Sequence, residues 1–416
     1  MKPLLSAFSR VAIVSLAAIV FTSCATRQVA SGDQLATDFG EVADRKSVPS
    51  LIPEFFDTGP AIKSKMLKLI EEATDYILID SYLVVIDSVT MEVMEALKEK
   101  HRSGVRIYVL ADSSSRFMPP GKSGDKYLEA AGIPWAEYNP IRPYKLVVAP
   151  VMLLRDHRKF WIVDGRVLFL GGANILAASL NPPELGGNLD FMVAIESAQA
   201  IEQMIGSFVT EWNESSDEKL RVESFRVRAN RNPESELWLF DQNTLFGREN
   251  TISKMNASLF ALARKEVWLI QPYAFVNSNL IRQIKTMAAR GVEVNLMLSG
   301  SVHAPRFHYA SFYGIKDVID AGGKVWVFRP ANGFLHAKGI VIDGRWASIG
   351  SANLNHRSYY LSKEANVVFD DPRSVAKIVE ILEDLKANCR PIELRESKLY
   401  RRGKYYITWR LMKWMG

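Results

Sequence analysis

The chain has 416 residues, and at about 150 residues per domain this length predicts two to three domains. Hydrophobic residues make up 48% and charged residues 24%, values that exclude a disordered chain, a collagen-like repeat and a bundle of membrane spans. The two cysteines, Cys24 and Cys389, are too few for a disulfide framework or a cysteine-rich zinc site.

The formal net charge of +6 is concentrated at the carboxyl end of the chain. Residues 391–416 contain seven Lys or Arg and two Glu, so this tail carries +5, whereas residues 24–390 carry −1. General nucleic-acid binders have basic residues along a groove, and a nearly neutral body with a basic tail differs from that pattern. We therefore expect no nucleic-acid partner.

Residues 1–23 are typical of a secretory signal peptide. Lys2 and Arg10 precede an apolar stretch, residues 11–21, which is too short to span a bilayer comfortably and is followed by small residues. Cys24 stands directly after them and resembles the acylated cysteine of bacterial lipoproteins. An uncleaved anchor and simple secretion are the alternatives. The pattern predicts an exported, membrane-anchored lipoprotein that faces the periplasm, with the outer membrane slightly favoured.

Residues 24–50 mix polar and small residues without sustained periodicity, so we expect a linker after the lipidated cysteine. From residue 62 onward, the same order of elements occurs twice. The first half predicts helices at 62–73 and 89–101 and strands at 76–85 and 104–111, and the second half predicts helices at 252–263 and 279–290 and strands at 267–275 and 291–298. In each half a further helix and a short strand follow.

Alternating strands and helices at this spacing predict the α/β fold class with a parallel or mixed sheet. Repeats near 190 residues are too long for a solenoid and indicate paired domains. We place the first lobe at residues 51–240, the second at 241–392 and a basic, aromatic tail at 393–416. Its aromatic and basic residues favour contact with an anionic bilayer surface, with packing against the body as the alternative.

Both halves contain the pattern His-x-Lys-x4-Asp. The first copy is His157, Lys159 and Asp164, and the second is His336, Lys338 and Asp343. In a strand, the lysine lies on the same face as the histidine two residues before it, so imidazole and ammonium point into one cleft and suit a phosphate. Each aspartate begins a predicted hairpin turn, and we expect it to pin that turn or a lysine rather than to carry a proton.

A glycine-containing segment that ends in asparagine follows each motif. The segments are Gly171-Gly172-Ala173-Asn174 and Gly350-Ser351-Ala352-Asn353. Glycine lets the backbone approach phosphate oxygens closely, and the asparagine amide can donate hydrogen bonds to them. Gly172, Asn174, Ser351 and Asn353 are therefore candidate substrate-binding residues.

The two motifs resemble those of the phospholipase D superfamily and, within it, the bacterial cardiolipin synthase and related phosphatidyltransferase branch. The resemblance extends over residues 51–392. It implies a phospholipase D-like duplication, in which two α-β-α sandwich lobes are related by a pseudo-twofold axis and share one active site at their interface. Arg357-Ser358 match the family's Arg-Ser after Asn353, whereas Ser362 stands where many synthases have Asn, a departure that bears on the choice of acceptor.

The resemblance also implies roles for the motif residues in a two-step mechanism. His157 matches the family's usual nucleophile, which attacks phosphorus to form a phosphohistidine, and His336 matches the usual general acid and base. Side chains would hold the phosphate oxygens without a metal or other cofactor, namely Lys159, Lys338, Asn174 and Asn353. Asp190 and Glu364 stand where family members have the carboxylates that orient the histidines.

The predicted function is that of a phosphatidyltransferase that forms cardiolipin or a related phospholipid from phosphatidylglycerol. Its expected partners are phospholipid substrates and the bacterial membrane surface, and a monomer is expected. Three alternatives remain open: a phospholipase D-type hydrolase, a nuclease and a non-catalytic membrane adaptor. An apolar insertion at residues 146–154 fits either a buried strand or a loop that touches lipid.

Overall fold

The computed structural model describes residues 38–117, 123–140, 153–228, 232–243, 250–300, 305–329 and 333–412. All of them belong to one compact unit. The predicted signal peptide, Cys24 and most of the apolar insertion lie outside the described residues; Leu154, at the end of the insertion, is buried. Within the described ranges, every helix is too short or too polar to cross a membrane.

The first sheet has eight strands in the described part of the chain, in the order β14-β9-β8-β7-β3-β4-β5, with β2 beside β9. These strands are β2 (Glu54–Thr58), β3 (Tyr76–Ser81), β4 (Arg106–Asp112), β5 (Trp135–Tyr138), β7 (Lys159–Val163), β8 (Val167–Gly171), β9 (Asn188–Ile195) and β14 (Phe334–Leu335). The strands β3, β4 and β5 run parallel, whereas β7, β8 and β9 pair antiparallel. The sheet is therefore mixed, as predicted.

Helices cover both faces of this sheet because its strands are apolar on both sides. Ile77 and Ile79 of β3 pack with three helices, α3 (Gly59–Glu72), α4 (Met91–Arg102) and α5 (Asp125–Ala131). Tyr76 and Leu78 point the other way, toward α8 (Ala198–Ser215). Alternate residues of a strand face opposite sides, so one continuous apolar run supplies both layers.

The second sheet repeats this plan with ten described strands, in the order β1-β10-β17-β16-β15-β11-β12-β13-β18, with β6 beside β17. They are β1 (Val48–Ser50), β6 (Arg155–Asp156), β10 (Ser235–Gln242), β11 (Glu266–Gln271), β12 (Glu293–Ser299), β13 (Lys324–Phe328), β15 (Gly339–Ile342), β16 (Trp346–Gly350), β17 (Ser362–Phe369) and β18 (Cys389–Pro391). The helices α9 (Thr251–Leu262), α10 (Ser278–Ala289) and α11 (Pro305–Asp320) cover one face, and α13 (Pro372–Lys386) covers the other.

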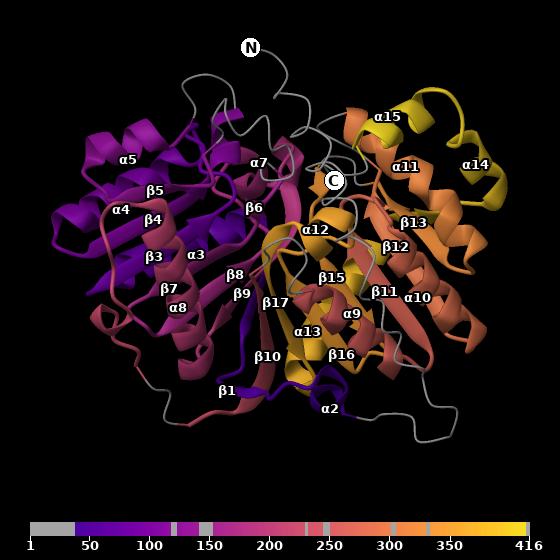
Figure 1. The fold of residues 1–416 in the computed structure, drawn as a ribbon, viewed down its shortest axis with the longest axis horizontal. Coiled ribbons are helices and arrows are strands. Elements are labelled where there is room, and N and C mark those ends of the chain that lie inside the picture. Colours follow the sequence, from indigo (N-terminus) through magenta and orange to yellow (C-terminus); the bar gives the residue numbers. More distant parts are fainter. Residues whose placement is uncertain are drawn as a thin grey trace, which may run out of the picture. The chain divides into compact units, whose positions relative to one another are not determined.

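The remaining helices are short. They are α2 (Phe39–Ala43), α7 (Ala177–Leu180), α12 (His356–Tyr360), α14 (Leu394–Leu399) and α15 (Lys404–Met412), with 3-10 turns at Ser113–Phe117, Pro183–Leu185 and Val222–Ser224. In Figure 1 most of the first lobe runs from indigo through magenta. Most of the second lobe is orange and yellow, but α2 and β1, in indigo, and β10 also belong to it.

One hydrophobic core joins the two lobes. It contains α8, α13 and the faces of both sheets that these helices cover. Phe55 of β2 and Phe369 of β17 meet across the lobes with ring centroids 5.3 Å apart in an edge-to-face arrangement. The prediction of two α-β-α lobes is confirmed, and each predicted helix and strand of the duplication is present within a few residues of its expected bounds.

The prediction of a linker at residues 24–50 is wrong for its described end. Phe39 in α2 is fully buried, with ring centroids 5.3 to 5.8 Å from those of Trp238, Phe240 and Trp346. The strands β1 and β10 pair in the second sheet, so residues 48–50 and 235–240 also belong to the second lobe. A single aromatic residue in a polar segment gives no periodicity, which is why the sequence pattern missed this contact.

We predict that Phe39→Ala lowers the free energy of unfolding by about 3–5 kcal/mol, because it opens a cavity among three aromatic rings. Lys46→Ala is the control. Lys46 is exposed and lies three residues beyond Ala43, the last residue of α2, so this change should alter stability by less than about 0.5 kcal/mol. Urea denaturation followed by tryptophan fluorescence measures both. Equal midpoints for the two variants would contradict the assignment of Phe39 to the core.

Candidate functional site

Both motif histidines line one cavity of about 270 Å³. His157 comes from the first half of the chain and His336 from the second. The other lining residues are Tyr82, Leu83, Tyr273, Phe307, Asn353, Asn355, Arg357, Ser358 and Ser362. The cavity thus has aromatic and polar walls, and it brings together the two halves of the duplicated motif.

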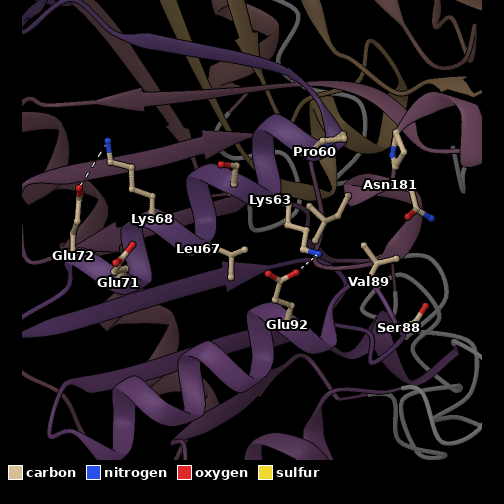
Figure 2. Close-up of a pocket in the computed structure, with 13 residues that line it drawn as sticks. Pro60, Lys63, Leu67, Lys68, Glu71, Glu72, Ser88, Val89, Glu92 and Asn181 are labelled. Carbon is tan, nitrogen blue, oxygen red and sulfur yellow. Dashed lines mark ion pairs between the residues drawn. The ribbon is translucent and has the colours of Figure 1, made fainter.

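A larger hollow, of about 930 Å³, lies elsewhere, between α3, α4 and the end of α7 (Figure 2). Its charged side chains pair with each other: Lys63 lies 2.5 Å from Glu92, and Lys68 lies 3.8 Å from Glu72. None of the motif residues lines it. We therefore place the candidate site in the smaller cavity.

Each histidine directly follows a two-residue strand that pairs with the sheet of the other lobe. The strand β6 runs parallel to β17, and the His157 backbone N–H donates to the Lys363 carbonyl at 3.0 Å. The strand β14 runs parallel to β9, and the His336 N–H donates to the Leu189 carbonyl at 2.8 Å. This exchange of short strands places both imidazoles at the boundary of the lobes.

The prediction that the histidines lie within strands is wrong. The strands β7 and β15 begin at Lys159 and Gly339, so each histidine occupies the break between two strands. Residues in such a break leave the ladder of the first strand before they join the second, which allows the chain to pass from one sheet to the other. Each lysine still turns back toward its histidine and donates a hydrogen bond to that histidine's carbonyl oxygen.

The two predicted orienting carboxylates each contact the histidine of the other half. Nδ1 of His157 lies 3.1 Å from both carboxylate oxygens of Glu364, and Nδ1 of His336 lies 2.5 Å from Oδ2 of Asp190. Both carboxylates are fully buried. A carboxylate that accepts the Nδ1 proton fixes the tautomer and leaves Nε2 as the reactive nitrogen of the ring.

Gly172 and Ser351 lie behind these carboxylates, a placement that differs from the prediction that both bind substrate. The Ser351 hydroxyl donates to Oε2 of Glu364 at 2.5 Å. A Cβ atom on Gly172 would lie 2.0 Å from Oδ1 of Asp190, so only glycine leaves room for that carboxylate. These two positions support the histidine–carboxylate pairs from behind.

Burial lowers the pKa of His157 and of His336 to about 4, although Glu364 and Asp190 oppose the shift. Burial likewise lowers the pKa of Lys159 to about 7 and that of Lys338 to about 8. The imidazoles are therefore neutral near neutral pH before an anion binds. Binding of an anion would favour the charged forms of all four groups and raise their pKa values.

The two motif asparagines occupy different places. Asn353 lines the cavity, whereas the side-chain oxygen of Asn174 accepts a hydrogen bond from the Leu83 backbone N–H at 3.1 Å and supports that lining residue. Oδ1 of Asn353 and the hydroxyl of Ser362 are buried and have no hydrogen-bond partner among the described residues. Buried polar atoms normally have partners, so these two indicate where a polar ligand group would bind.

Asp164 and Asp343 lie at the far ends of their strands, about 20 Å along the chain from the histidines. Asp164 accepts hydrogen bonds from the backbone N–H groups of residues 74–76, and Asp343 accepts them from residues 264–266. Both have a left-handed backbone, with φ of 52° and 54°. Each aspartate holds its hairpin turn to the start of the neighbouring strand. These two motif residues therefore have a structural role, away from the cavity.

The residues without a role assigned from the sequence include Tyr82 and Arg357, which line the cavity, and Phe334, which lies beside His336. The ring centroid of Tyr82 lies 4.8 Å from that of His157, and the guanidinium of Arg357 lies 3.4 Å from the Tyr82 hydroxyl. On the other side, the ring centroid of Phe334, which lies just before His336, is 6.0 Å from that of His336. The equivalence of Tyr82 and Tyr273 in the two repeats was the available signal for the cavity-lining tyrosines.

A buried charge cluster behind His157 was also missed. The Arg158 side chain is fully buried and pairs with Asp156 at 2.5 Å, Asp241 at 3.1 Å and Asp80 at 3.3 Å. Burial raises the pKa of Asp80 well above its usual value, and Asp156 adds to the effect. The sequence feature that could have indicated this cluster is an aspartate inside each of two apolar strands, β3 and β10. The cluster fixes the backbone on both sides of His157.

A family model described as "Cardiolipin synthase, PLD-like domain" matches residues 66–212 and 257–386. Each matched segment contains one copy of the His-x-Lys-x4-Asp motif. The two segments also correspond to the two lobes.

Two curated relatives are named cardiolipin synthases. The chain is 28% identical over 320 residues to "Cardiolipin synthase 2" of Bacillus anthracis, covering 76% of this chain and 60% of that protein. It is 26% identical over 357 residues to "Cardiolipin synthase 1" of Staphylococcus epidermidis, covering 85% of this chain and 69% of that protein. The chain thus spans about three fifths of the first relative.

Among solved structures, the phosphatidylserine synthase of Haemophilus influenzae Rd KW20 has a similar fold. The TM-score is 0.69 at 15% sequence identity, and the match covers 89% of this chain and 97% of that one. At this identity the likeness concerns the fold alone.

The crossed pairing predicts how each carboxylate affects the imidazoles. Glu364→Gln should lower the pKa of His157 below about 4 and leave that of His336 unchanged, because only His157 loses a carboxylate partner. Asp190→Asn should do the reverse. Titration of the imidazole nitrogens by ¹⁵N NMR measures both shifts, and each variant serves as the control for the other. A shift of the histidine in the same half would contradict the exchange of strands.

Proposed function

The chain belongs to the family of cardiolipin synthase, PLD-like domains, and on that premise we propose that it is a phosphatidyltransferase that forms cardiolipin from phosphatidylglycerol. The observation that carries this proposal is the cavity with two neutral imidazoles, each backed by a buried carboxylate, and two lysines beside them. The names of the curated relatives support a phospholipid substrate.

In the first step, Nε2 of His157 attacks the phosphorus of one phosphatidylglycerol. A nitrogen–phosphorus bond forms and the bond from phosphorus to the glycerol oxygen breaks. His336, protonated at Nε2 once the anionic phosphate has bound, gives that proton to the glycerol oxygen, so glycerol leaves. The order of the two histidines follows the family pattern. Glu364 stabilises the positive charge that develops on His157, and Lys159 and Lys338 offset the charge on the phosphate oxygens.

In the second step, a hydroxyl of a second phosphatidylglycerol gives its proton to His336, and its oxygen attacks the phosphorus. The new phosphorus–oxygen bond completes cardiolipin, the nitrogen–phosphorus bond breaks, and both histidines return to their starting states. Asp190 stabilises the protonated His336 before the first step and again after the second. Water in place of the lipid hydroxyl would give phosphatidic acid, so exclusion of water from the cavity decides between transfer and hydrolysis.

The acceptor hydroxyl is proposed to bind beside Ser362 and Asn353. Their buried polar atoms lack partners among the described residues and line the cavity. Ser362 lies two residues before Glu364 on β17, so both side chains leave the strand on the same face. Gln242 fixes the backbone there, since its amide donates to the carbonyls of Ser358 at 2.6 Å and Ser362 at 2.9 Å. A glycerol headgroup supplies hydroxyls that can satisfy both atoms.

We predict that His157→Ala and His336→Ala each reduce cardiolipin formation by about 10²–10⁴-fold or more, because each histidine performs a step that the other cannot perform. His101→Ala is the control, since His101 lies at the end of α4 and bonds the Val105 carbonyl at 3.2 Å. Radiolabelled phosphatidylglycerol and lipid chromatography measure the product. Full activity in either cavity variant would contradict the mechanism, and phosphatidic acid as the main wild-type product would indicate a hydrolase.

Ser362→Ala is predicted to lower the ratio of cardiolipin to phosphatidic acid about tenfold. The loss of one hydrogen bond weakens binding of the acceptor alcohol, whereas it has less effect on the reaction of water. Ser362→Asn, which restores a donor and an acceptor, should retain more transfer. Ser348→Ala is the matched control, since Ser348 is also buried but contacts Met255 in the core. An unchanged product ratio in Ser362→Ala would remove Ser362 from the acceptor site.

A further inference from the structure

The last described helices expose alternating apolar and basic side chains. Of the eight large apolar side chains that are exposed in the described part of the chain, five lie in residues 394–411. Leu411 is 72% exposed, Leu399 62% and Ile407 59%. Exposed basic residues lie between them. The set, here named the basic-apolar platform, comprises Leu394, Arg395, Lys398, Leu399, Arg402, Lys404, Tyr406, Ile407, Arg410 and Leu411.

The opposite face of these helices packs firmly on α11. The ring centroid of Trp409 lies 4.8 Å from that of Tyr313, and that of Tyr400 lies 4.9 Å from that of Phe312. Arg401 forms an ion pair with Asp317 of the same helix. For this face the structure shows the alternative considered for the tail, packing against the body. The platform is therefore a fixed surface of the second lobe (Figure 1).

The layer beneath the platform is also a wall of the candidate active site. Met412 of α15 is buried beside Phe275 and Ala310, and Tyr273 and Phe307 pack against this cluster. Tyr273 and Phe307 line the cavity that holds the two histidines. One aromatic layer thus connects the platform to the catalytic cavity.

The charge of the platform restricts what can bind it. Glu396 is the one acidic residue in the sequence from 394 to 412, and Arg390 binds it at 2.7 and 2.9 Å. The surface that remains is positive and interrupted by aliphatic side chains. Apolar groups stabilise burial at the headgroup boundary of a bilayer, while Lys and Arg meet anionic phosphates there. A nucleic acid would use the charges but not exposed Leu and Ile.

We propose that the basic-apolar platform docks on the surface of an anionic phospholipid bilayer and brings the catalytic cavity next to the lipid headgroups. The contact is made by the carboxyl end of the second lobe, so it acts independently of any anchor at the amino end. It supplies a reason for the aromatic layer between the platform and the cavity, since that layer fixes the distance of the cavity from the membrane.

Sedimentation with lipid vesicles tests the proposal on the full chain. One vesicle type contains phosphatidylcholine alone and the other also contains phosphatidylglycerol, and the gain in binding on the second type is the quantity compared. An amino-terminal anchor would contribute to both types alike. Replacement of three basic residues, Lys398→Gln, Arg402→Gln and Arg410→Gln together, should reduce that gain on the order of 100-fold, about fivefold for each charge.

The matched control removes three exposed basic residues from the first lobe: Lys68→Gln, Arg102→Gln and Lys126→Gln. The control changes the net charge by the same amount but leaves the platform intact. It should therefore reduce the gain in binding by only a few-fold. Among apolar positions, Ile407→Ser with Leu411→Ser should weaken binding about tenfold or more, whereas Val222→Ser, 43% exposed in the first lobe, should have no effect. Circular dichroism checks that every variant is folded.

The assay measures vesicle binding and requires no enzymatic turnover. It therefore tests the docking proposal separately from the proposed function, even if the chain forms no cardiolipin. Equal affinity for the two vesicle types would overturn the proposal. So would equal losses in the platform triple variant and the control triple variant. A loss in the charge variant without a loss in the apolar variant would also overturn it, and would favour a nucleic acid or another soluble polyanion as the partner.

Discussion

The site depends on two very short parallel strand pairs that exchange backbone between the lobes. The pairs β6–β17 and β14–β9 involve two residues on each strand, and each carries the following histidine into the opposite lobe. Lys363, which accepts the hydrogen bond from the His157 backbone, and Glu364, which contacts the His157 ring, are neighbours on β17. The pairing of β6 with β17 therefore fixes both the backbone of His157 and its carboxylate partner. Neither lobe contains a complete histidine–carboxylate pair by itself. Catalytic competence therefore requires the joint folding of both halves.

Burial of charge is the second constraint, and it acts in opposite ways on two sets of residues. Around Arg158, three carboxylates compensate the guanidinium and hold the backbone near His157 in one position. At the cavity, the lysines and histidines remain incompletely compensated, and their pKa values are lowered. Under the proposed function, a substrate phosphate bound near Lys159 and Lys338 would supply the missing negative charge. The cavity is thus electrostatically preorganised to bind an anionic substrate.

Much of the fold could be predicted from the sequence because each repeat contains long apolar runs with clear periods, such as residues 76–81 and 266–271. The motif spacing also identified both histidines, and the resemblance to the family implied both carboxylates. Their pairing could not be predicted, since Asp190 and His336 are 146 residues apart and contact each other only through the exchanged strands. Phe39 was missed for a similar reason, because its partners are distant in sequence and its neighbours are polar.

The two halves of the cavity have diverged despite their common plan, and the divergence gives the site a direction. The ring of Tyr82 and the guanidinium of Arg357 lie near His157, and Ser362 adds a polar group to the lining. Around His336 the lining is aromatic, with Tyr273 and Phe307, and this wall rests on the helix that supports the basic-apolar platform. Under the proposed function, we expect a phospholipid to bind with its headgroup toward Arg357 and its apolar part toward Tyr273 and Phe307. Because these two walls differ, the divergence of the repeats would let the site distinguish the two ends of such a substrate.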